Sequence, residues 1–117
     1  MAQIGLNHRL TVANTLKEQT RAVYQGVLGA SIASPRPEIE IFTFDNGSGI
    51  GAFYVEPSEA LTPAQHMKAI WLEFDVDDEA ATAAKLAGLG LTPFEYFDKQ
   101  HKYFQAPGGQ VFRLAQR

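Results

Sequence analysis

The sequence predicts an α+β protein built from two halves that share one order of elements: a strand, a helix and three further strands. A strand that leads directly into a helix occurs twice, at residues 4–28 and 70–90. Short β-rich segments separated by turn residues follow each of these units, and a polar segment with two prolines lies between the halves. The repeated order predicts an internal duplication whose halves close around a shared cavity.

In the first half, a strand is expected at residues 4–13 and a helix after it. The segment Thr15–Glu18 has the form of a capping box, and Gly29 suits the left-handed backbone position that ends a helix. Three short strands are then expected at residues 30–33, 39–44 and 50–55. Asn46 and Gly47 predict a hairpin turn between the last two strands, because both residue types tolerate positive φ.

In the second half, the strand at residues 70–76 alternates between two chemically different faces. One face is apolar, and the other carries Trp71, Glu73 and Asp75. Asp78 is expected to cap the following helix, which ends near Gly88. Further strands are expected at residues 92–97, 103–105 and 110–115, and one short helical turn is expected in the segment between the halves.

Length and composition narrow the class of protein. A chain of 117 residues has the size of one domain, which we divide into a first module at 1–55, a linker at 56–68 and a second module at 69–117. The net charge of −3 without a concentrated basic segment argues against nucleic acid and membrane partners. Cysteine is absent, which excludes thiolate chemistry, and residues 1–15 lack a signal-peptide pattern. A cytoplasmic protein is expected.

Three segments resemble one known family. They are VYQGVLGA at residues 23–30, FDVDDEAATAAKLAGLGL at 74–91 and YFQAPGGQVFRL at 103–114. All three resemble the glyoxalase, bleomycin-resistance protein and extradiol dioxygenase group, also called the vicinal oxygen chelate superfamily. The resemblance implies two tandem βαβββ modules that form a cup-shaped mixed β-sheet with helices on the outer face. It also implies a homodimer.

The resemblance implies a divalent metal held by ligands from the first strand of each module and from the last strand. These positions correspond to His8, Trp71 and Arg113 in this sequence. An indole has no lone pair for a metal, and a guanidinium is a permanent cation. We therefore expect no metal cofactor, although His66 and Glu73 offer donors that could rescue a site together with His8.

The expected ligand-binding residues are His8, Trp71, Glu73 and Arg113. Arg113 either clamps an acidic group of a ligand or forms an internal pair with Glu73. Trp71 either provides a flat wall for a planar ligand or fills the volume of the absent metal. His8 either acts as a general base or makes an ordinary hydrogen bond. No catalytic residue is assigned, and whether the protein is an enzyme stays open.

Three functions are compatible with these residues. The first is a metal-free protein that binds a small planar or acidic molecule in the sheet cavity. The second is a metal-dependent enzyme of the glyoxalase or dioxygenase kind that uses an atypical ligand set such as His8, Glu73 and His66. The third is a dimeric interaction module whose pocket is filled by its own side chains. A cavity filled by the protein's own side chains would favour the third function, and an open cavity would favour one of the first two.

Overall fold

The computed structural model describes residues 1–117, and its strands form two separate sheets. The first sheet has the order β1-β4-β3-β2 and consists of β1 (Asn7–Ala13), β2 (Ser31–Arg36), β3 (Ile39–Thr43) and β4 (Gly49–Val55). Strands β1 and β4 are parallel, and the other pairs are antiparallel. The predicted hairpin turn is confirmed, with Gly47 at a φ of 86° between β3 and β4.

The second sheet has only three strands. It has the order β5-β7-β6 and consists of β5 (Leu72–Val76), β6 (Lys102–Gln105) and β7 (Val111–Gln116). The strand predicted at residues 92–97 was wrong, because that segment makes one isolated bridge, between Phe94 and Tyr103. The rings of the consecutive residues Tyr96 and Phe97 both lie against Tyr103, at 4.9 and 6.0 Å between centroids. An extended strand would send them to opposite faces.

The first helix begins differently from its prediction. Residues 14–16 form a 3₁₀ turn, which leads into α1 (Lys17–Arg21) and then a π-helical segment, Ala22–Val27. No side chain caps α1. The predicted capping box was wrong because Thr15 lies inside the 3₁₀ turn, and a capping side chain belongs to an extended residue that precedes the helix. Gly29, at a φ of 81°, ends the helical segment as predicted.

The other two helices follow their sequence signals. The short helix α2 (Pro63–His66) lies in the linker, and a capping box between Thr62 and Gln65 begins it. Helix α3 (Glu79–Gly88) is capped as predicted, because the Asp78 carboxylate accepts a hydrogen bond of 3.0 Å from the Ala81 N–H. A 3₁₀ turn, Pro57–Glu59, precedes α2. With ten residues in α3, no helix has the length and apolar character needed to cross a bilayer.

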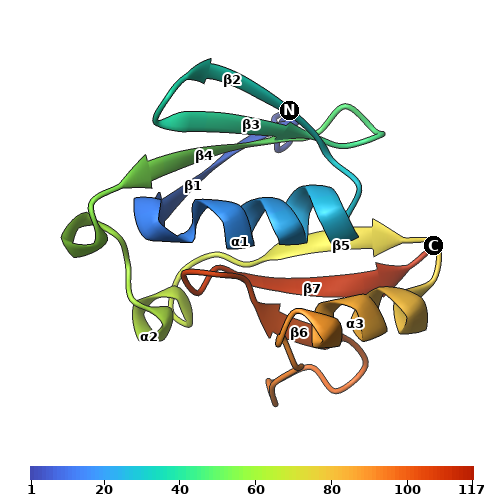
Figure 1. Cartoon of the computed structure of the whole chain (residues 1–117). Helices are drawn as coiled ribbons and strands as arrows, with labels where there is room; N and C mark the ends of the chain where they lie inside the picture. The colour runs from blue at the N-terminus through green and yellow to red at the C-terminus, as the bar shows by residue number, and fades with distance from the viewer.

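The helices and one face of each sheet form the hydrophobic core. In Figure 1, α1 runs between the four-stranded sheet and the strands of the three-stranded sheet, and α3 lies beside the latter. The Tyr24 ring joins the two sheets, at 5.4 Å from Phe42 and 6.1 Å from Phe74. Phe112 and Leu114 face this core and are fully buried, as their strand parity predicted. Burial of each such side chain stabilises the fold by about 1.5–3 kcal/mol.

One ion pair has a buried carboxylate on the helix-facing side of the first sheet. Glu40 on β3 is 1% exposed and accepts hydrogen bonds of 3.0 and 2.8 Å from the Nε of Arg21 on α1. The Arg21 Nη2 also donates to Glu40, and the Tyr54 hydroxyl donates a further bond, of 2.7 Å. Burial alone would raise the pKa of Glu40, but the bonds from Arg21 and Tyr54 outweigh it and lower the pKa. The pair therefore attaches α1 to the first sheet.

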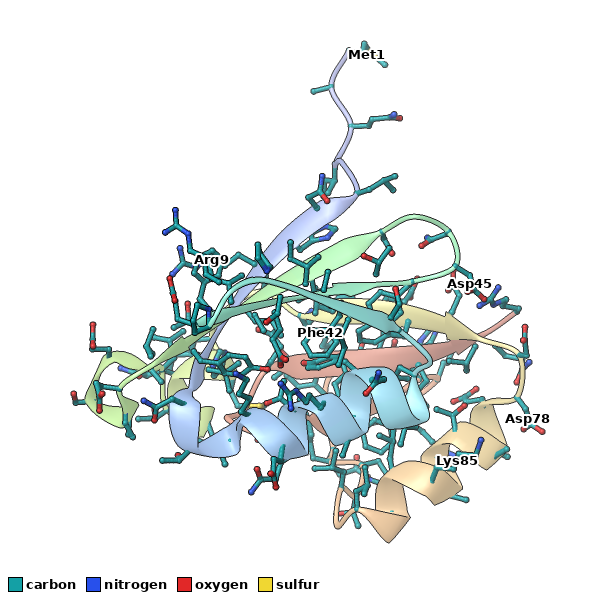
Figure 2. All side chains as sticks on the ribbon, turned by 45° about the horizontal axis from the view of Figure 1, so that its top comes forward. Met1, Arg9, Phe42, Asp45, Asp78 and Lys85 are labelled. Atoms are coloured by element: carbon teal, nitrogen blue, oxygen red, sulfur yellow. The ribbon has the colours of Figure 1, made fainter.

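Each sheet has a second face that points away from this core. On the first sheet it carries Arg9, Ile41 and Phe53, and on the second it carries Glu73 and Arg113, because side chains alternate along each strand. Figure 2 shows the residues before β1 running away from the body of the molecule to Met1. We call the outward surface of the four-stranded sheet the first open face, and the outward surface of the three-stranded sheet the second face.

Candidate functional site

The structure brings together three of the four residues predicted to bind a ligand. Glu73 on β5 and Arg113 on β7 are direct partners in the parallel register, and Trp71 lies just before β5. The Arg113 Nε donates a hydrogen bond of 2.7 Å to the Glu73 carboxylate. Its guanidinium lies 4.5 Å from the centre of the Trp71 ring. The ion pair between Arg113 and Glu73, which was one of two alternatives expected from the sequence, is therefore formed. The Trp71 indole stacks on the guanidinium of this pair.

Arg113 has further partners that the sequence did not reveal. Its Nη1 donates bonds of 3.1 Å to Asp98 and 2.9 Å to the Tyr103 hydroxyl. The same hydroxyl donates to Asp98 at 3.2 Å, and the Asp98 carboxylate also lies 2.6 Å from His101 Nδ1. We call Arg113, Glu73, Asp98 and Tyr103 the arginine network. Asp98 was missed because it lies in a loop, where no periodicity predicts the direction of a side chain.

The network leaves Arg113 little capacity to bind a ligand. Both of its carboxylate partners are close, and 20% of its side chain is exposed. Hydrogen bonds to Tyr103 and Glu73 raise the pKa of the guanidinium. The Gln100 N–H, His101 and Tyr103 lower the pKa of Asp98. Two carboxylates therefore neutralise a single cation, and the cluster carries no excess positive charge for an acidic ligand.

A loop also covers the second face. Tyr103 is completely buried, and its ring contacts Trp71 edge-on at 5.8 Å between centroids. The rings of Phe94, Tyr96 and Phe97 lie on its other sides, at 6.3, 4.9 and 6.0 Å. These are the residues that were expected to form a strand. The aromatic side chains of this loop thus pack on the second face beside the arginine network.

His8 lies apart from this cluster along its strand. It shares strand parity with Leu10 and Val12, which are buried in the core, whereas its neighbour Arg9 points to the first open face. The His8 side chain makes no hydrogen bond to the protein and is half-buried. Its assignment as a ligand-binding residue stays a prediction, as do those of Trp71 and Glu73.

The donor groups of the chain do not fit a metal ion. No three side chains of His, Asp or Glu lie close enough to share one, and this includes the set His8, Glu73 and His66. Glu73 is held by Arg113. His66, on α2, is 5% exposed with an unpartnered Nδ1, and burial lowers its pKa. A divalent ion needs about three protein donors, which are not assembled here.

A cavity of about 230 Å³ opens beside the free edge of β5. Phe44 and Phe74 form apolar walls, and Asp45, Glu73, Asp75 and Arg117 form the charged part of the lining. Three carboxylates face one guanidinium there, so the cavity repels an acidic ligand. Of the four predicted binding residues, only Glu73 lines it.

The strand order and the two outward faces are similar to those of solved structures described as glyoxalase/bleomycin resistance and fosfomycin resistance proteins. Three similar structures illustrate this. A glyoxalase/bleomycin resistance protein from Albidiferax ferrireducens has a TM-score of 0.70 and 14% identity, over 98% of this chain and 99% of that chain. The fosfomycin resistance protein FosX from Mesorhizobium loti has a TM-score of 0.69 and 16% identity, over 100% and 94%.

A mutant of FosX from Listeria monocytogenes, complexed with Mn(II) and dihydroxypropylphosphonic acid, has a TM-score of 0.71 and 16% identity, over 97% of this chain and 90% of that chain. No family model and no curated protein matches the sequence. The structural likeness confirms the predicted fold, and the chemistry has to be argued from the residues of this chain.

Proposed function

We propose that this protein binds a small planar or acidic molecule without a metal ion and does not transform it. One observation carries the proposal. At two positions where the resemblance implies metal ligands, Arg113 and Trp71 form a stacked pair, and Arg113 is bonded to Glu73 and Asp98. A permanent cation in this place opposes the binding of a divalent ion. The absence of cysteine suits the reducing cytoplasm, where we propose that the protein acts.

In this proposal Trp71 is the surface on which a planar ligand rests. Its side chain is half-buried, and Arg113 and Tyr103 hold it from one side. Glu73 keeps 38% of its side chain exposed and can accept a hydrogen bond from the ligand. Arg113 then acts as a positioning residue, because its donors are engaged by the arginine network.

Trp71 also provides the experiment, since it is the single tryptophan of the chain. Titration of benzoate, phenyl phosphate and benzylamine into protein purified without chelator should change its fluorescence for at least one probe. Metal analysis of the same sample should find no stoichiometric divalent ion. A bound ion that is lost in the variant His8→Ala would overturn the metal-free proposal and favour the enzyme with an atypical ligand set.

A second candidate, a dimeric interaction module, is favoured by the loop that covers the second face. Tyr103 is fully buried beneath the aromatic residues of that loop. If the face is filled, its function is to pack against another chain, and a homodimer is the simplest assembly. Light scattering that gives twice the mass of 12.9 kDa, together with no fluorescence response to any of the three probes, would support this candidate.

A further inference from the structure

The starting observation is the distribution of partners among the arginines. Four of the five have a carboxylate partner, in the pairs Arg21–Glu40, Arg36–Glu38, Arg113–Glu73 and Arg117–Asp77. Arg9 has no carboxylate oxygen within 4.0 Å and makes no side-chain hydrogen bond. It is therefore the one arginine whose charge is left uncompensated by a close partner.

Arg9 is nevertheless held in a defined position. Its guanidinium carbon lies 3.9 Å from the centre of the Phe53 ring, so the guanidinium stacks on the aromatic face. Arg9 is paired in register with Gly51 on β4. A methyl group added to Gly51 would lie 3.5 Å from Phe53 Cε1, which shows that the ring leans over the glycine. The glycine, the ring and the guanidinium thus form a layered platform.

Such a platform suits the recognition of an oxyanion. The ring removes water from one face of the guanidinium and restricts its rotamers, while the N–H groups at its edge remain unpaired. This fork matches both oxygens of a carboxylate or two oxygens of a phosphate. Ile41, 37% exposed on β3 and paired with Gly51, adds apolar area on the same face. The ligand group should therefore be an anion attached to an apolar or planar body.

Neither the arginine network nor the cavity beside β5 suits an acidic group. Arg113 is neutralised by two carboxylates, and the cavity beside β5 is itself acidic. In Figure 2, Arg9 and Asp45 of that cavity lie on opposite sides of the molecule. Because the chain carries a net charge of −3, a single free guanidinium fits one small anion better than a polyanion.

We propose that Arg9, stacked on Phe53 of the first open face, binds the carboxylate or phosphate group of a small ligand. The inference rests on the proposed function that the protein binds a small acidic molecule, and it places the acidic group on the first open face instead of beside Trp71. Arg9 replaces Arg113 in the recognition of that group. Phe53 acts as the positioning residue, which holds the guanidinium flat and partly dehydrated.

The experiment compares four variants by isothermal calorimetry with benzoate and phenyl phosphate, which separate carboxylate from phosphate recognition. Arg9→Met should weaken binding of the preferred probe by about tenfold or more. This is the change in affinity expected when one charge-assisted hydrogen-bonded pair is lost. Phe53→Leu should weaken it by less, because the charge remains. Arg36→Met removes an arginine that is 72% exposed and should leave the affinity unchanged. Arg113→Met tests whether the second face takes part in binding. Circular dichroism checks that each variant is folded.

The outcomes distinguish the two proposals. If Arg9→Met binds like the wild type while Trp71 fluorescence still reports the ligand, the role of Arg9 is overturned and the proposed function stands. If Arg113→Met and not Arg9→Met abolishes binding, the acidic group lies on the second face and the inference fails.

If the wild type binds neither anion but binds benzylamine, the Arg9 site is refuted and the ligand is a cation. If it binds no probe, both proposals fail.

Discussion

Two arginines of this protein each stack on an aromatic ring, but only one of them has carboxylate partners. Arg9 stacks on Phe53 in the first module, and Arg113 stacks on Trp71 in the second. Arg113 is enclosed by Glu73, Asp98 and a buried tyrosine, whereas Arg9 has no charged partner. The comparison teaches that the same stacking of an arginine on an aromatic ring leaves one guanidinium without a carboxylate partner and gives the other one two.

The segment that follows the helix of each module causes this difference. In the first module that segment is β2, which pairs with β3 and extends the sheet. In the second module residues 92–101 leave the sheet after one bridge, and the loop places Asp98 beside Arg113. A segment whose backbone pairs in a sheet stays at the sheet edge, and a segment without such pairing can fold across a face.

The largest effect is expected from the hairpin turns of the two modules. Gly109 has a φ of 109°, and an added Cβ would lie 2.6 Å from Pro63 Cα on α2, so Gly109→Ala should cost about 3 kcal/mol or more. Gly47 has a φ of 86° but meets only Leu6 Cδ1, at 3.8 Å, so Gly47→Ala should cost about 1 kcal/mol. Urea unfolding measures both. Equal losses would show that α2 does not pack tightly against the second module.

Removal of the arginine that pairs with the buried Glu40 should have the next largest effect. Arg21→Met leaves Glu40, which is 1% exposed, without its main partner, so the free energy of unfolding should fall by about 3 kcal/mol. The control is Arg36→Met, whose partner Glu38 is half exposed, and it should change stability by less than about 0.5 kcal/mol. A small loss for Arg21→Met would mean that water reaches Glu40.

Removal of the arginine on the second face should cost less. In Arg113→Met, Glu73 keeps 38% exposure and can be solvated, so we expect a loss of about 1 kcal/mol. The protein should remain folded, as judged by circular dichroism and urea unfolding. A loss as large as that of Arg21→Met would show that the arginine network mainly stabilises the fold of the second module.

The smallest effect concerns His66, which belongs to the linker that packs against the second module. Burial lowers its pKa in the folded protein, so the unfolded chain binds the proton more readily. The neutral form of His66 therefore contributes to the free energy of unfolding above the pKa of about 6.5 that this histidine has in the unfolded chain. This contribution is lost as the pH falls below that value. Between pH 7.5 and 5.5 the loss should be at most about 1 kcal/mol. Thermal unfolding of His66→Gln should lack this slope, whereas His8→Gln should retain it.

Local patterns in the sequence determined a large part of the fold. The alternation of β5 and β7 was enough to put Glu73 and Arg113 on one face and Phe112 and Leu114 in the core. The Asp78 cap and the turn at Gly47 also followed from the residues themselves. These features depend on periodicity and on the backbone preferences of single residues, which neighbouring positions in the chain reveal.

The tertiary structure alone decided which charges are neutralised. Asp98 reaches Arg113 from a loop 15 residues away, and no carboxylate reaches Arg9. The segment 92–97 has the composition of a strand, yet its aromatic rings pack around the buried Tyr103 instead. Such outcomes depend on contacts between segments that are distant in sequence, because packing against a neighbouring segment can override the preference of a short segment for extended backbone.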